Sequence, residues 1–326
     1  MALLLRSRPS ALFARRGGVI ITANGRCTLS LMLSALLLVS AAALERRLLL
    51  LPGAAALARG SVPGPLAEPA SPRTPGPSDS ASVAAGGGRK LQSCAAWYPT
   101  AFAAVCRCTS LAEIDCTGRN FASGIPSGSN FLAGYTNLTR VKFTNCQLSS
   151  LPAGLFAGLA SLQEIHLGQN FLTALPDGIF AGLPSLTRIS LNNNKLASLS
   201  DGVFAGAPML ATIELQTNLI VNISYKTFAG NLTSVVSLNM ASNLFTTLPA
   251  AFANLTSLEY LGVGDSQTLT SVAADAFTGL SRLRELSLAG QKALTTLPAG
   301  VFTGLTSLQY LRLGVCALAS IPDSAL

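Results

Sequence analysis

From about residue 110 onward, apolar residues recur along the chain in units of about 24 residues. The first apolar position of each unit falls at Leu138, Leu162, Leu186, Leu210, Val235, Leu258, Leu283 and Leu308, in steps of 23 to 25 residues. A partial unit with Leu111, Ile114 and Cys116 at its apolar positions precedes these eight. A fixed period of this length is typical of a solenoid, in which each unit buries its apolar face against its neighbours.

Each unit follows the order L-x-x-L-x-L-x-x-N-x-L, and its middle residues alternate between apolar and polar as a strand requires. The pattern therefore predicts eight strands stacked in parallel. The ninth position is an asparagine in the middle repeats, where we expect a buried amide to bond to backbone groups that the turn leaves unpaired. These residues are Asn170, Asn194, Asn218 and Asn243, replaced elsewhere by Cys146, Ser266, Gln291 and Cys316. The units starting at Leu258 and Leu283 carry one extra residue after this position, which predicts a reshaped turn.

One phenylalanine per repeat occupies a fixed phase, and we expect these rings to stack into a continuous ridge that fills the outer half of the core. The column is Phe156, Phe180, Phe204, Phe228, Phe252, Phe277 and Phe302. An aromatic ligand box is the alternative interpretation, and regular placement favours the core.

The net charge of +8 belongs to the N-terminal third of the chain. Residues 1–93 hold 11 basic and 3 acidic side chains (11 − 3 = +8), whereas residues 94–326 hold 11 of each (11 − 11 = 0). Because the excess lies outside the repeats, it does not indicate a nucleic-acid partner. His166 is the only histidine, which excludes a zinc site built on several imidazoles.

Residues 1–44 combine five arginines with a run of small and apolar residues from 28 to 44. This composition predicts a secretory signal cleaved near Ala43, with a type II membrane anchor or an organelle presequence as alternatives. Residues 45–93 are rich in Pro, Ser, Ala and Gly and predict an extended linker, which leads to a cap at 94–137 and repeats at 138–326. The chain stops at IPDSAL without a cysteine cluster, so we expect no C-terminal cap.

The repeats, in which the second half follows the pattern LPxGxFxGLxxL, resemble the "typical" extracellular leucine-rich repeat family, as in variable lymphocyte receptors and Toll-like receptor ectodomains. The resemblance implies an α/β solenoid with a parallel β-sheet on its concave face and a disulfide-bonded N-terminal cap. The family's pairing would join Cys94 to Cys108 and Cys106 to Cys116. A zinc site on these four cysteines is the alternative, although only one pair is close and its spacing is short. Cys146 and Cys316 are interpreted as small buried residues.

The resemblance places the ligand-binding side chains on the concave face, where strands lie about 4.8 Å apart. Arg140, Glu164 and Arg188 can pair with one another there, which makes a self-satisfied charge ladder the alternative to a binding site. Small residues follow the strands toward the C-terminus, and we expect a larger partner to lie close to the backbone there. Tyr260 and Tyr310 are its expected anchors, because tyrosine is enriched at binding hot spots. The candidate contact residues are Arg140, Lys142, Glu164, His166, Arg188, Asn192, Glu214, Tyr260, Asp265, Glu285, Tyr310 and Arg312.

Four N-x-S/T sequons lie in the repeats, at Asn137, Asn222, Asn231 and Asn254, and we expect them off the strands.

We predict a non-catalytic extracellular recognition protein with a protein or glycan ligand, no cofactor and no metal. It would be secreted, or held at a membrane through residues 28–44 if these are uncleaved. The alternatives are an intracellular or organellar scaffold or inhibitor, and the ectodomain of a larger receptor. An autonomous enzyme is disfavoured because the repeats contain no P-loop or nucleophile–base pair.

Overall fold

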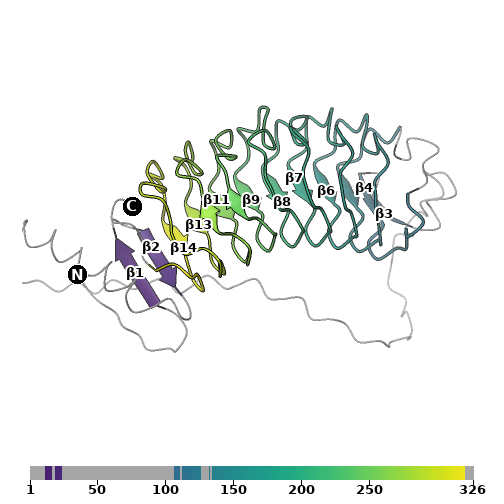
Figure 1. The fold of residues 1–326 in the computed structure, drawn as a ribbon. Coiled ribbons are helices and arrows are strands. Elements are labelled where there is room, and N and C mark those ends of the chain that lie inside the picture. The colour runs from purple at the N-terminus through teal and green to yellow at the C-terminus, as the bar shows by residue number, and fades with distance from the viewer. Residues whose placement is uncertain are drawn as a thin grey trace, which may run out of the picture.

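The computed structural model describes residues 106–110, 112–125, 132 and 134–319, together with the backbone of 12–16 and 19–23. Within these residues, nine short strands run in parallel along the repeats and pair in chain order to form one sheet (Figure 1). They are β4 (Glu113–Asp115), β5 (Arg140–Lys142), β6 (Glu164–His166), β7 (Arg188–Ser190), β8 (Thr212–Glu214), β9 (Ser237–Asn239), β11 (Tyr260–Gly262), β13 (Glu285–Ser287) and β14 (Tyr310–Arg312). The predicted solenoid of eight repeats and a partial first repeat is confirmed.

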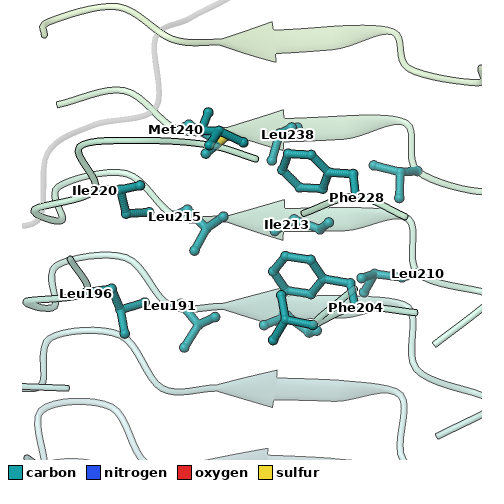
Figure 2. Close-up of a cluster of buried hydrophobic side chains, with 14 of the residues drawn as sticks. Leu191, Leu196, Phe204, Leu210, Ile213, Leu215, Ile220, Phe228, Leu238 and Met240 are labelled. Carbon is teal, nitrogen blue, oxygen red and sulfur yellow. The ribbon is translucent and has the colours of Figure 1, made fainter. Parts of the chain in front are cut away.

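The core lies behind the sheet and is built from the repeating leucine positions. The central residue of each strand points inward and is almost fully buried, with Ile213 and Leu238 both 0% exposed. Figure 2 shows these two residues packed with Leu215, Met240 and the ring of Phe228 from neighbouring repeats. Each repeat thus closes the apolar face of the one before it, as a solenoid requires.

Asparagine at the ninth position forms the predicted backbone bridges between repeats. The Asn170 carboxamide oxygen accepts hydrogen bonds from the amides of Cys146 (2.8 Å) and Leu148 (3.1 Å). Its nitrogen donates to the carbonyls of Phe143 (2.7 Å) and Leu167 (2.9 Å). Asn194, Asn218 and Asn243 repeat this arrangement and are buried.

The turn is reshaped in the two longer repeats, as the extra residue predicts. Ser266 donates to the carbonyl of Phe245 (3.2 Å), and Thr268 donates to the same carbonyl (2.8 Å). Gln291 reaches the carbonyl of Val263 at 2.6 Å. A second small parallel sheet forms here from β10 (Thr247–Leu248) and β12 (Ser271–Val272).

The phenylalanine column fills the other side of the core, and its rings stack in two runs. Successive rings from Phe156 to Phe252 lie 5.9–6.3 Å apart between centroids, and Phe277 stacks on Phe302 at 6.1 Å. Among the described residues, no ring contact joins Phe252 to Phe277. The expectation of one continuous ridge was therefore wrong, because the stack is interrupted where 24-residue repeats give way to 25-residue repeats.

Both ends of the repeat sheet carry an additional strand pairing. β3 (Arg107–Ser110) pairs antiparallel with β4 at the N-terminal end. At the other end, β2 (Val19–Ala23) lies beside β14 in parallel and is itself paired with β1 (Leu12–Arg16) in an antiparallel hairpin (Figure 1). The predicted leader thus contributes two strands to the sheet, an arrangement that the sequence analysis did not anticipate.

No helix among the described residues is long and apolar enough to cross a bilayer. The candidate span at 28–44 and the linker at 45–93 lie outside these residues.

Candidate functional site

The outward side of the parallel sheet, which we call the concave face, is formed by the two residues that flank the buried centre of each strand. In β5, β6 and β8 both flanking residues are half-buried, and in β14 both are exposed. The parallel register places equivalent residues directly beside one another, so that Arg140 is opposite Glu164 and Glu164 is opposite Arg188. Side chains from successive repeats therefore form two columns along the face.

A network of charged side chains covers the N-terminal part of this face. Arg140 bonds to Glu164 in a bidentate manner, with Nη2 to Oε1 at 2.8 Å and Nε to Oε2 at 2.9 Å. Its Nη1 atom also reaches Glu113 at 3.1 Å, and Lys142 contacts the other oxygen of Glu113 at 2.6 Å. Two carboxylates thus hold two cations within three adjacent strands.

These contacts keep both carboxyl groups ionised. Hydrogen bonding from Arg140 lowers the pKa of Glu164 to about 2, and burial opposes this shift only in part. The hydrogen bond from Lys142 likewise lowers the pKa of Glu113 below its usual value. In turn, Glu164 and Glu113 raise the pKa of the Arg140 guanidinium. This part of the face therefore keeps its charge pattern throughout the physiological pH range.

The predicted charge ladder is present, with one change of partner. Glu164 uses its Oε2 atom for His166 Nε2 as well (2.9 Å). Arg188 pairs with Glu214 on the following strand, β8. The expectation that Arg140, Glu164 and Arg188 form one cluster is thus correct for the first two residues. Arg188 belongs to a separate pair, because Glu164 is already held by Arg140 and His166.

The C-terminal part of the face is less charged and presents the two predicted tyrosine anchors. Tyr260 is half-buried and lies over its own strand, so that a side chain at Gly262 would meet its hydroxyl at 2.7 Å. Burial, with the nearby charge of Glu285, raises the pKa of Tyr260. Tyr310 is 43% exposed. Beside it, Arg312 bonds to Glu285 at 2.8 Å.

The column of small residues that follows the strands is already occupied by neighbouring groups. A side chain at Gly168 would meet Asn192 Oδ1 at 2.5 Å, and one at Gly264 would meet the carbonyl of Ala289 at 2.7 Å. These glycines therefore serve contacts between repeats, and the expected room for a partner close to the backbone is filled. Asp265 lies in the exposed turn after β11, where its φ is 58°.

The N-terminal cap contains the predicted Cys106–Cys116 disulfide, with the two Cα atoms 4.3 Å apart. This bond uses two of the four thiols that the alternative zinc site would need. Cys94 lies outside the described residues, and so does the Cys108 side chain. Cys146 and Cys316 are buried and donate to the carbonyls of Cys116 and Leu288, as expected of small residues at the asparagine position.

The four sequon asparagines, Asn137, Asn222, Asn231 and Asn254, are all exposed and lie outside the strands.

The concave face carries one imidazole, that of His166, together with several carboxylates. Its only imidazole, His166, is held by an already ionised carboxylate, with no serine or cysteine nucleophile bonded to it among the described residues. Nor does any group of three His, Cys, Asp or Glu side chains within the described ranges have the arrangement of a metal site.

Comparison with known proteins identifies the repeats directly. A family model described as "Leucine rich repeat" matches residues 136–196, 160–220, 208–267 and 261–318, which together cover more than half of the chain. This chain belongs to the leucine-rich repeat family. No match was found among curated proteins.

Three solved leucine-rich repeat structures illustrate the similarity. Human 5T4 (trophoblast glycoprotein) is 28% identical with a TM-score of 0.50, over 65% of this chain and 81% of 5T4. Toll from the Drosophila Toll–Spatzle complex is 26% identical with a TM-score of 0.51, over 60% of this chain and 25% of Toll. An internalin of Listeria monocytogenes is 23% identical with a TM-score of 0.48, over 64% of this chain and 56% of the internalin. The chain thus spans about half of the internalin and a quarter of Toll.

The sequence analysis missed the hairpin that lies beside the last leucine-rich repeat strand. Its signal is present as LFARR-GG-VIITA, because two glycines between apolar and β-branched segments are typical of a two-residue hairpin. The arginine-rich leader pattern overlaps these residues and suggested a targeting role instead.

Proposed function

We propose that this leucine-rich repeat chain is a non-catalytic recognition protein that binds a protein or glycan ligand on its concave face, outside the cell. The observation that carries the proposal is the unbroken series of outward side chains on nine parallel strands, of both charge signs and ending in the exposed Tyr310 and Arg312. Large side chains presented from a rigid sheet lose little freedom on binding, and Tyr and Arg are enriched at binding hot spots.

The charge network gives this surface a local pattern that a ligand must match. Because Arg140, Glu164 and Glu113 neutralise one another, we expect them to add little to affinity. Their role in binding is specificity, since a ligand that does not match their charge pattern is rejected. The C-terminal part of the face would supply most of the binding energy, because Tyr310 is exposed and less constrained by neighbouring charges.

Two features support an extracellular location. The Cys106–Cys116 disulfide is typical of an oxidising compartment. All four sequons are exposed and leave the concave face free, which suits a glycoprotein that binds there. Toll, one of the similar proteins, is seen in complex with Spatzle.

The binding surface can be tested with a glycan placed on it. Arg188→Asn creates the sequon Asn-Ile-Ser on β7, whereas Arg188→Gln removes the same ion pair without adding a glycan. Each secreted protein would be screened against arrays of extracellular proteins and glycans. We expect a ligand that binds the parent and Arg188→Gln chains but is lost on the glycosylated Arg188→Asn chain. Asn222→Gln, which alters a sequon off the strands, should bind normally, and a ligand that still binds the glycosylated Arg188→Asn chain would overturn the proposal.

An intracellular or organellar scaffold is the second candidate, and one observation favours it. The pairing of β2 with β14 requires residues 12–23 and the repeats to lie in the same compartment. Intact mass of the natural protein, with and without reduction and deglycosylation, separates the two. A glycosylated, disulfide-bonded chain supports the extracellular proposal, and a reduced, unmodified chain supports the scaffold.

A further inference from the structure

The last strand of a solenoid presents a problem that the interior strands do not have. An edge strand exposes unpaired N–H and C=O groups, and the last repeat exposes its apolar cross-section. The inward side of β14 is nevertheless as buried as that of an interior strand, because its central residue Leu311 is 0% exposed and Leu313 only 2%, while its outward residues Tyr310 and Arg312 are exposed. Leu261 and Leu286, at the centres of β11 and β13, are also 0% exposed.

The free edge of β14 is filled by a segment from the other end of the chain. β2 runs parallel to β14 with Ile20 beside Tyr310, Ile21 beside Leu311 and Thr22 beside Arg312. This is the same register relation that β13 has with β14, where Glu285 is beside Tyr310. β2 therefore continues the sheet as a ninth full repeat strand would (Figure 1).

The sequence of the segment suits this position. β2 reads VIITA, and such β-branched residues favour strands. Gly17 and Gly18 alone separate it from β1, and a Gly-Gly pair is a favoured two-residue hairpin connection. β1 becomes the outermost strand and ends in Arg15 and Arg16, and charged residues on an edge strand disfavour further pairing.

We propose that the edge of β14 is a strand-acceptor site and that its occupant is the chain's own hairpin, Leu12–Ala23. In the form of the protein that keeps its N-terminus, this segment covers the outer edge of the last described repeat strand, β14. The inference does not rest on the proposed function, because β14 is the only repeat strand in the described residues with which the hairpin pairs.

The proposal makes the leader a structural part of the protein. Cleavage near Ala43 would remove both hairpin strands, and a membrane span at 28–44 would separate them from the repeats. Either event would leave β14 open to a second chain, since exposed edges favour edge-to-edge association. Retention of the N-terminus and a closed solenoid are therefore expected to occur together.

A designed disulfide tests the pairing in the full 326-residue chain. Ile20→Cys combined with Tyr310→Cys places two cysteines at directly paired positions of β2 and β14. Ile20→Cys with Tyr260→Cys is the mismatched control, because β11 lies two strands farther into the sheet. After mild oxidation, peptide mapping should find a link between positions 20 and 310 within one chain, and no link in the control. A folded variant without this link, or with the link only between two chains, would overturn the proposal.

Hydrogen exchange supplies a second readout that does not depend on disulfide formation. Ile20→Pro with Ile21→Pro removes two consecutive N–H donors from β2, and proline is excluded from paired inner strands. Leu37→Pro with Leu38→Pro, outside the hairpin, is the matched control. We expect exchange of the peptide spanning β14 to quicken about tenfold or more in the hairpin variant only, while the peptide spanning β7 is unchanged. Equal protection of β14 in both variants would contradict the proposal, and this result says nothing against ligand binding on the concave face.

Discussion

The repeats from Leu138 to Val235 and those from Leu258 onward use one strand scaffold with different internal chemistry. The first group has phenylalanines 24 residues apart, an asparagine bridge in four of its five members and nearly parallel phenylalanine rings from Phe156 to Phe228. The second group has 25-residue spacing, Ser266, Gln291 and Cys316 at the asparagine position, and a separate ring pair. The sheet runs through both without a break.

The difference shows which features the solenoid needs in every repeat and which it can vary. The buried strand centre and the inward leucines are present throughout. The residue at the asparagine position varies, but it still donates a hydrogen bond to a backbone carbonyl of the preceding repeat. In the repeat starting at Leu258, Ser266 and Thr268 both donate to the carbonyl of Phe245. The concave face changes with it, from the charge network of the first group to the tyrosines, small residues and Arg312–Glu285 pair of the second.

Removing a ring from the regular stack should have the largest effect. Phe180→Ala deletes a fully buried ring with a stacked neighbour on each side, and we expect a loss of about 3–5 kcal/mol in the free energy of unfolding. Phe302→Ala, at the end of the second group and 4% exposed with one stacked neighbour, should cost less. Urea unfolding compares the two, and equal losses would show that ring stacking does not distinguish the groups.

The polar bridge should also matter more in the first group. Asn194→Ala leaves the carbonyls of Leu167 and Leu191 and the amide of Leu172 without this partner, at an expected cost of about 3 kcal/mol. Ser266→Ala should cost about 1 kcal/mol, because Thr268 still donates to Phe245. Thermal unfolding of both variants measures the difference, and the reverse order would contradict the role assigned to the asparagines.

Val315, in the second group, has a left-handed backbone conformation, and replacing it should stabilise the folded chain. The position before the bridge has a positive φ in successive repeats, with 54° at Asn193 and 58° at Val315. Asparagine tolerates this conformation, whereas a β-branched residue is strained there. Val315→Asn should therefore stabilise the chain by about 1 kcal/mol and Asn193→Val should destabilise it by about as much. Both shifts are measurable as changes in Tm, and opposite signs would refute the assignment.

The charge network should produce a small acid dependence confined to the first group. The folded pKa of Glu164 is lowered to about 2, so its contribution to stability is present above its unfolded pKa and is lost as the pH falls toward 2. Because Arg140 and Glu164 are both partly exposed, we expect this contribution to be about 0.5–1 kcal/mol. NMR titration of Glu164 should show its pKa rising in Arg140→Met but not in Arg188→Met, whose parent residue pairs with Glu214. An unchanged pKa in Arg140→Met would contradict the network.

The repeat period predicted the fold because burial of one face per repeat fixes both strand position and register. The same alternation placed Arg140, Lys142, Glu164 and His166 on one surface. Spacing alone could not predict that Arg188 would pair with Glu214, since this choice depends on Glu164 being occupied already. Nor could it predict that Gly262 lies under the Tyr260 hydroxyl, because side-chain rotation is not encoded in the period.

The hairpin at the edge of β14 shows a different limit of sequence reasoning. Its residues are more than 280 positions from β14, and no local pattern links the two segments. The Gly-Gly signal predicts a hairpin, but its partner strand follows only from the sheet that the repeats build.

The most direct test of the concave face as the recognition surface is hydroxyl-radical footprinting of the chain with the ligand found in the array screen. Three tyrosines report on three positions: Tyr260 and Tyr310 lie on the concave face, and Tyr225 lies off the strands with 67% exposure. The account predicts that ligand binding lowers oxidation of Tyr310, and to a smaller extent of the half-buried Tyr260, while Tyr225 is oxidised as in the free chain. Protection of Tyr225 with unchanged oxidation of Tyr310 and Tyr260 would contradict it.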